Sequence, residues 1–380
     1  MYFLDNASTT QVLKEVNDEI SYYNLNEFYN PSAVYDCSTN ISKKMFDKKK
    51  YLAEILNVKD ENIVFTSGAT EGNNLIIKGL LTNNKNAEFL FSLGEHPSVY
   101  NVAKYLQTNG YKVDFIKLQN DGTIDFEDYK SKVNSNTYFI SVIHVSNETG
   151  AINDIKKLSD YAKKVNPNLI FHADGVQAFC KIPVNLKELN VDAYTVSAHK
   201  FHGPKGVGFV YIKNLNKLKS QILGGGQQNN FRSGTENVPG IFGMVKAVEI
   251  SQTNLKTNYD KVLSYRNFVK EELLKNISNI KINECDNNSP YILSASIEGI
   301  KGEVLLHMLD KKGVCISTGS ACSSKNANNR MLQSCGASKK EIEGNIRISF
   351  TDLLSFDDVK QATKIIIEEI AKLKAMIGVN

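Results

Sequence analysis

Lys200 is a candidate for covalent chemistry because of the segment in which it lies. It follows the strand-forming run "DAYTVS" and precedes a glycine-rich turn, within "YTVSAHKFHGPKGVGFVY". An amine held at the end of a strand, beside helix dipoles and a phosphate site, can be tuned to form a Schiff base with a carbonyl compound. Most lysines are solvated surface charges, so Lys200 alone does not define a site.

Two other segments could act together with Lys200. Asp174 and Gln177 follow an apolar run in "FHADGVQAF", where an unpaired carboxylate would be costly. The turn "TSGATEGNN" places small residues before a helix, and free backbone N–H groups there can bind a phosphate. Each segment alone is explained equally well by a helix cap or a turn. Together, a phosphate turn, a carboxylate for a ring nitrogen and a Schiff-base lysine are what pyridoxal phosphate requires.

The pattern of apolar runs predicts the elements that position these residues. Short β-branched and aromatic runs alternate with helical patterns, which is typical of a buried, mostly parallel sheet in an α/β protein. Ligands of such sheets bind at the carboxyl ends of the strands, where we expect Asn147, Asp174 and Lys200. From about residue 255 a long polar helix and further strands predict a second, smaller domain.

The composition restricts the class of protein. No apolar run approaches the roughly 18 residues that span a bilayer, and the N-terminus lacks the features of a signal peptide, so we expect a cytoplasmic protein without membrane contact. The 45 basic and 41 acidic residues leave a net charge of +4, which does not favour direct nucleic-acid binding. The six cysteines show no CxxC spacing, which argues against structural disulfides and a zinc site, so we expect no metal.

The chain resembles the NifS/IscS cysteine desulfurases, pyridoxal-phosphate enzymes of the class V aminotransferase family, from residue 4 to about residue 350. The matching motifs, in family order, are "LDNASTT", "NPSA", "FTSGATEGNNLIIKG", "EHPSV", "HVSNETG", "HADGVQAFCKIPV", "SAHKFHGPKGVGFVY", "GGGQ", "RSGTEN", "STGSACSS" and "IRISF". The resemblance implies an α/β protein of fold type I, like aspartate aminotransferase. Its large domain would surround a mostly parallel seven-stranded sheet, and its smaller C-terminal domain would be α+β. We expect residues 16–255 to form the large domain, and residues 1–15 and 256–380 the small domain that carries the catalytic cysteine loop.

The resemblance also implies an activity and a set of site residues. The family works as a homodimer that converts L-cysteine to L-alanine and keeps the sulfur as a persulfide on an enzyme cysteine. Residues matching the family's contacts to pyridoxal phosphate are Ala69, Thr70, Asp174, Gln177, Ser197, His199, Lys200 and, from the partner subunit, Thr235. His96 in "EHPSV" matches the catalytic histidine stacked on the cofactor ring. Gln177 matches the hydrogen-bond donor to the pyridoxal oxygen.

Two residues match those that hold the substrate carboxylate, Asn147 and Arg347. A planar guanidinium offers two parallel donors to a carboxylate, which a lysine cannot do. Only four of the 45 basic residues are arginines, so we expect Arg347 in "NIRISF" to have a role that needs a guanidinium group.

Cys322 in "STGSACSSKNANN" is expected to be the sulfur-accepting nucleophile. Its neighbours are small and polar, which suits an exposed thiolate better than a buried apolar position. Cys335 could be a second acceptor, but we favour packing at a helix end. We assign the other four cysteines, and His144 and His172 within strand runs, to structural roles.

The destination of the sulfur stays open between iron–sulfur cluster assembly and thiolation of tRNA or a cofactor. We therefore expect a sulfur-acceptor protein as partner, such as an iron–sulfur scaffold or a tRNA-thiolation enzyme. The sequence departs from the family in "QNNF" after "GGGQ" and in "TDLLSF" after "IRISF", which leaves substrate range and docking open. Alternative activities are a selenocysteine lyase or another class V enzyme such as a transaminase. A non-catalytic docking protein would be expected to lose Lys200, Asp174 or Cys322, and all three are present.

Overall fold

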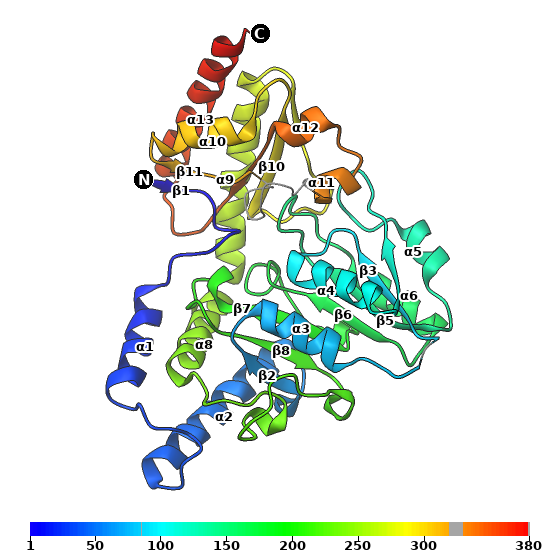
Figure 1. Ribbon diagram of the computed structural model, residues 1–380. Helices are drawn as coiled ribbons and strands as arrows, with labels where there is room; N and C mark the ends of the chain where they lie inside the picture. Colours follow the sequence, from blue (N-terminus) through cyan, green and yellow to red (C-terminus); the bar gives the residue numbers. More distant parts are fainter. Residues whose placement is uncertain (85, 319–329, 379–380) are drawn as a thin grey trace.

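The computed structural model describes residues 1–84, 86–318 and 330–378 (Figure 1). Its largest sheet has seven strands in the order β2-β8-β7-β6-β5-β3-β4. Their bounds are β2 Ile63–Thr66, β3 Glu88–Ser92, β4 Lys112–Ile116, β5 Thr137–Ile143, β6 Ile170–Asp174, β7 Ala193–Ser197 and β8 Gly208–Ile212. Only β8 runs antiparallel to its neighbours, β2 and β7, and the other adjacent strands are parallel. The predicted mostly parallel seven-stranded sheet is confirmed.

Both faces of this sheet are covered by helices, and this explains the continuous apolar runs in the sequence. Phe89 and Phe91 of β3 pack in a core with α3 and α4, whereas Leu90 between them packs in a second core with α1, α2, α6 and α8. Successive side chains of a strand point to opposite faces, so a strand buried on both sides needs apolar residues at every position. These helices are α1 Lys14–Leu25, α2 Asp36–Leu56, α3 Ala69–Gly79, α4 Pro97–Thr108, α6 Ile155–Val165 and α8 Val238–Thr253.

A second set of elements packs around a three-stranded antiparallel sheet in the order β12-β10-β9. The bounds are α9 Leu255–Asn276, β9 Ile280–Ile282, β10 Ile292–Ile297, α10 Gly302–Asp310, β12 Asn345–Ser349 and α13 Phe356–Ile377. The chain's first residues join this part, because β1 (Tyr2–Phe3) pairs with β11 (Val314–Cys315) and Leu4 lies in the same core (Figure 1). The domain boundaries drawn from the sequence stay a prediction.

The remaining elements are short. They are α5 Phe126–Lys132, α7 Leu186–Leu189, α11 Arg330–Ser334, α12 Lys339–Glu343 and the 3-10 turns η1 Asp60–Asn62, η2 Ala198–Lys200, η3 Leu215–Lys217 and η4 Gln228–Asn230. Within the described ranges, no helix combines the length and hydropathy needed to cross a membrane.

Candidate active site

A cavity of about 580 Å³ opens at the carboxyl ends of β5, β6 and β7. Its volume is in the range of ordinary small-molecule sites. Ten of the twelve residues predicted from the sequence line it: Ala69, Thr70, His96, Asn147, Asp174, Gln177, Ser197, His199, Lys200 and Arg347. Thr235 does not line the cavity of its own chain, and Cys322 lies outside the described residues.

The N-terminus of α3 forms one end of the cavity. Gly68 precedes the helix with φ +141°, a conformation that favours glycine, and its Cβ position would be 3.5 Å from Ser197 Oγ. The first N–H groups of a helix have no partner inside the helix, so those of Ala69 and Thr70 are suited to an anion. His199 lies in the same wall, and burial together with three neighbouring lysines lowers its pKa to about 4. The turn predicted to open a helix and to bind phosphate therefore has the required geometry.

Lys200 ends η2, the turn that follows β7. Its Nζ donates to the backbone oxygens of Ala7 and Ser8, at 2.7 and 2.6 Å. The N-terminal segment therefore holds the amine in the wall of the cavity, which Ala7 and Ser8 also line. The motif "LDNASTT" matches the family in this segment, but the sequence predicted no site role for its residues.

Asp174 is the last residue of β6 and is only 2% exposed. Its Oδ1 accepts the Val176 N–H at 3.1 Å, and its Oδ2 accepts from Asn73 Nδ2 at 3.0 Å. Both donors are neutral, so a cation beside this buried carboxylate would stabilise it further. Asn73 also donates to Ser98 Oγ at 2.8 Å, and sequence analysis had not singled out this residue of α3.

His96 is the N-cap of α4 and lines the cavity. Its Nδ1 accepts the Ser98 N–H at 3.2 Å and lies 2.8 Å from Ser98 Oγ. Burial lowers the pKa of His96, and the positive charge of Lys200 lowers it further against the opposing effect of Asp174. A neutral imidazole that accepts at Nδ1 carries its proton on Nε2, so His96 can offer an N–H from that atom.

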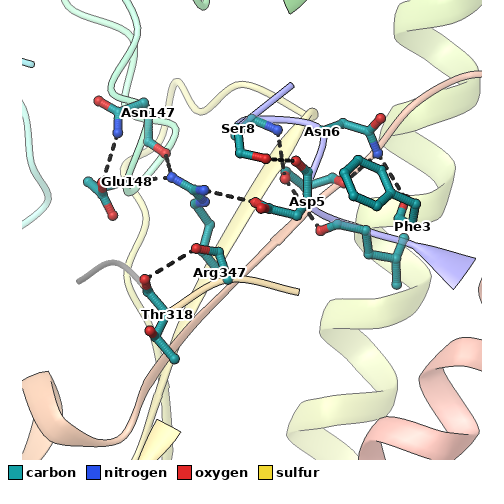
Figure 2. Close-up of polar contacts among 12 residues, drawn as sticks. Phe3, Asp5, Asn6, Ser8, Asn147, Glu148, Thr318 and Arg347 are labelled. Carbon is teal, nitrogen blue, oxygen red and sulfur yellow. Dashed lines mark hydrogen bonds and ion pairs between the residues drawn. The ribbon is translucent and has the colours of Figure 1, made fainter. Parts of the chain in front are cut away.

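Arg347 lies in β12 and is held by two carboxylates and a carbonyl group (Figure 2). Its Nη2 forms an ion pair with Asp5 Oδ1 at 2.9 Å, its Nη1 donates to Asn147 O at 2.8 Å, and Glu148 Oε1 is 3.7 Å from Nη1. The Nε atom is buried and has no hydrogen-bond partner among the described residues. The Asn147 side chain, proposed for the substrate carboxylate, donates to Glu148 Oε1 at 2.8 Å instead. Arg347 therefore brings to the cavity wall a guanidinium group with more N–H bonds than its contacts to Asp5 and Asn147 use, as a carboxylate-binding residue requires.

Comparisons with known proteins identify the family of this chain. The family model "Aminotransferase class-V" matches residues 2–361. The chain belongs to the class-V aminotransferase family. Within this family it is 34% identical over 378 residues to a protein named cysteine desulfurase IscS from Dictyoglomus turgidum, covering 98% of this chain and 95% of the relative. A cysteine desulfurase IscS from Methanosarcina thermophila is 32% identical over 381 residues, covering 98% and 93%.

Solved structures agree with this class-V assignment. A NifS-like protein superposes with a TM-score of 0.92 at 30% identity, over 98% of this chain and 100% of the other. A NifS-like protein from Rickettsia africae gives a TM-score of 0.86 at 28% identity, over 99% of both chains. The chain has the fold type I architecture expected from the resemblance, and its relatives are cysteine desulfurases of a family that depends on pyridoxal phosphate.

One end of the segment that contains Cys322 lines the cavity of this class-V fold, and the other contacts the residues directly before His96. Ser317 and Thr318 line the cavity, and Ser317 is paired through its backbone with Arg347. On the other side, Arg330 donates to the backbone oxygens of Leu93 and Glu95, directly before His96. The position of Cys322 itself stays a prediction.

Cys335, His144 and His172, for which structural roles were predicted, are buried. Cys335 is 7% exposed at the end of α11, and burial raises the pKa of its thiol to about 12, which disfavours a reactive thiolate. His172 bonds to Ser141 and Thr195, and burial lowers its pKa to about 3. His144 bonds to the Tyr194 hydroxyl group and has its pKa lowered to about 4 by burial. In the described part of the chain, no cluster of three His, Cys, Asp or Glu residues could hold a metal ion.

Proposed function

We propose that this chain is a sulfurtransferase that converts L-cysteine to L-alanine and receives the sulfur on Cys322 as a persulfide. The observation that carries the proposal is a single cavity that combines Lys200, Asp174, an anion-binding helix terminus and Arg347. A related structure, which superposes with a TM-score of 0.82 at 28% identity, is described as SspA in complex with cysteine. Relatives named cysteine desulfurase favour this activity over selenocysteine lyase or transaminase.

The cavity fits pyridoxal phosphate at each of its functional groups. The N-terminus of α3, Ser197 and His199 would hold the phosphate, and Asp174 would pair with the ring nitrogen. Gln177 Nε2 would donate to the ring oxygen, and Lys200 Nζ would bind the aldehyde carbon. When bound, the cofactor would supply an electron sink that weakens bonds at the substrate's amino-bearing carbon.

The chain's own residues would orient the substrate and move protons. Arg347 would bind the carboxylate of L-cysteine through N–H bonds that Asp5 and Asn147 leave unused, because each Nη atom carries two N–H bonds and these contacts use one of each. Lys200 and His96 line the cavity, where Nζ and Nε2 would each hold or transfer a proton. A positioned carboxylate and two positioned proton carriers are what the reaction needs from the protein.

The sulfur acceptor must be a nucleophile that the cofactor does not supply. A cysteine thiolate would attack the substrate sulfur, so that the S–S bond forms as the substrate C–S bond breaks, and a proton completes alanine. Cys322 is four residues after Thr318, which lines the cavity, and four extended residues reach at most about 14 Å. The persulfide would then pass to an acceptor protein for iron–sulfur cluster assembly or thiolation.

A second copy of the chain would complete the site. Thr235 is exposed and does not line its own cavity, as expected for a residue that contacts the partner's phosphate. Large apolar side chains are also exposed, including Leu25 at 74%, Val34 at 95% and Leu223 at 85%. A homodimer would place Thr235 at the partner's cavity and would cover apolar side chains of this kind.

The test is a cysteine pulse followed by alkylation of thiols and peptide mass analysis. We expect alanine and sulfide from the wild type, with the extra sulfur on Cys322. Cys322→Ala should keep the visible absorbance of bound cofactor and its change on adding L-cysteine, yet form no persulfide and little alanine. Cys335→Ala is the matched control and should resemble the wild type. Extra sulfur on Cys335, or normal alanine release by Cys322→Ala, would show that the acceptor has been misassigned.

A further inference from the structure

Lys181 is a buried lysine behind the cavity wall that the proposed mechanism does not use. It is 6% exposed, and its Nζ donates to Gln177 Oε1 at 2.6 Å. The Tyr291 ring lies beside the ammonium group, 5.6 Å from Nζ to the centroid. Burial lowers the pKa of Lys181 to about 7, and the positive charges of Lys200 and Arg347 contribute to the shift.

A lysine in this position is costly, because its buried ammonium group has no carboxylate partner among the described residues and loses several kcal/mol of hydration. An apolar side chain of similar length would fill the same space without that cost. Lys181 is therefore best explained by what its nitrogen does, and its hydrogen bond is to a residue of the cavity wall.

The partner of Lys181, Gln177, has two ends with opposite hydrogen-bonding character. Its Oε1 accepts from Lys181, and its Nε2 donates to Ala7 O at 2.8 Å. If the amide were rotated by 180°, Nε2 would face an amine donor and Oε1 would face a carbonyl oxygen. With Lys181 in its ammonium form both contacts would become repulsive, so Lys181 and Ala7 together select one orientation of the amide.

This orientation matters because Nε2 has two N–H bonds. One is used by Ala7 O, which also accepts from Lys200 Nζ at 2.7 Å. The other N–H remains for a ligand in the cavity, which Gln177 lines. The reversed amide would present an oxygen there and would repel an anionic oxygen of a ligand.

We propose that Lys181 is a positioning residue, which fixes the Gln177 amide so that its N–H group, and not its oxygen, faces the cofactor oxygen. The proposal rests on the proposed function, since pyridoxal phosphate is the ligand that Gln177 would contact. Lys181 itself touches neither cofactor nor substrate in this assignment.

The test measures the dissociation constant of pyridoxal phosphate by absorbance titration of the stripped full-length protein. Lys181→Met should weaken binding about tenfold, which corresponds to the loss of one hydrogen bond to a charged oxygen. In a Gln177→Leu background the same Lys181→Met change should have no further effect on affinity. It should raise the melting temperature there, because it removes a buried amine that has lost its acceptor. Lys164→Met on the exposed face of α6 is the matched control and should bind as the wild type.

The outcomes separate this role from a general structural one. Equal losses of affinity from Lys181→Met in both backgrounds, or no loss in the wild-type background, would overturn the positioning role and leave the proposed function intact. If Lys181→Met fails to fold but the double variant folds, the rescue would support the pair. A wild type that takes up no pyridoxal phosphate would instead overturn the proposed function, and this role with it.

Discussion

Replacing Arg347 by lysine tests the substrate side of the site, because it keeps the charge and removes the guanidinium fork. A lysine amine can still pair with Asp5, whose Oδ1 is 2.9 Å from Arg347 Nη2, so the fold should be retained. It cannot also reproduce the guanidinium N–H bonds that Asp5 and Asn147 leave unused, which would bind the substrate carboxylate.

The magnitude follows from the loss of one hydrogen bond between charged groups. Such a bond contributes about 1.5–3 kcal/mol, so kcat/KM for L-cysteine should fall about 10- to 150-fold. Most of the change should appear in KM, because the carboxylate is bound equally in the substrate and the transition state. The assay is steady-state alanine formation, with the visible spectrum and the melting temperature recorded on the same samples.

Arg266→Lys provides the matched control. Arg266 is also buried and bonded, with Nη2 2.5 Å from Glu284 and Nε donating to Ile292 O, but it does not line the cavity. Its replacement should change stability and leave KM unaltered. An unchanged kcat/KM in Arg347→Lys, or an equal loss in both variants, would refute the assignment of Arg347 to the substrate carboxylate.

Three further predictions concern the cofactor, the assembly and the pH dependence of stability. Lys200→Ala should abolish the visible absorbance of lysine-bound pyridoxal phosphate, and an unchanged spectrum would contradict its role. Light scattering should show a dimer, and Thr235→Ala should weaken cofactor binding while the dimer stays intact. A fully active monomer would exclude the shared site. The folded pKa of His172 is about 3 and its unfolded pKa is about 6.5, so protonation favours the unfolded state as the pH falls below about 6.5. Between neutral pH and pH 5, this protonation should lower the free energy of unfolding by about 2 kcal/mol, as measured by urea titration. In His172→Gln the free energy of unfolding should fall less over the same pH range.

The architecture was largely predictable from the sequence because it depends on local patterns. Continuous apolar runs indicate strands buried on both faces, and alternation with helices indicates a parallel sheet. The edge that carries ligands follows from the same pattern, so Asp174, Lys200 and the turn before α3 could be placed together. The antiparallel direction of β8 was not predictable, because the glycine-rich turn after Lys200 does not determine the direction of the strand that follows it.

The amino-acid sequence by itself determined which chemical groups this protein brings to the site. A lysine, a carboxylate and a small-residue turn at strand ends specify a cofactor class, because residue type and spacing decide what each strand end can offer. Cys322 belongs to this sequence-based part of the assignment and remains a prediction.

Only the tertiary structure decided how distant segments complete the site. Asp5 pairs with Arg347 across 342 positions, and Ala7 accepts from Lys200 across 193 positions. The N-terminal segment that makes these contacts begins with β1, which pairs with β11, and continues along the cavity wall at Ala7 and Ser8. Similarly, the sequence gives no sign that Lys181 is buried, because the spacing of nearby residues carries no information about its contact with Tyr291. Backbone pairing over long separations and the resulting desolvation are properties of the packed chain, and no local pattern encodes them.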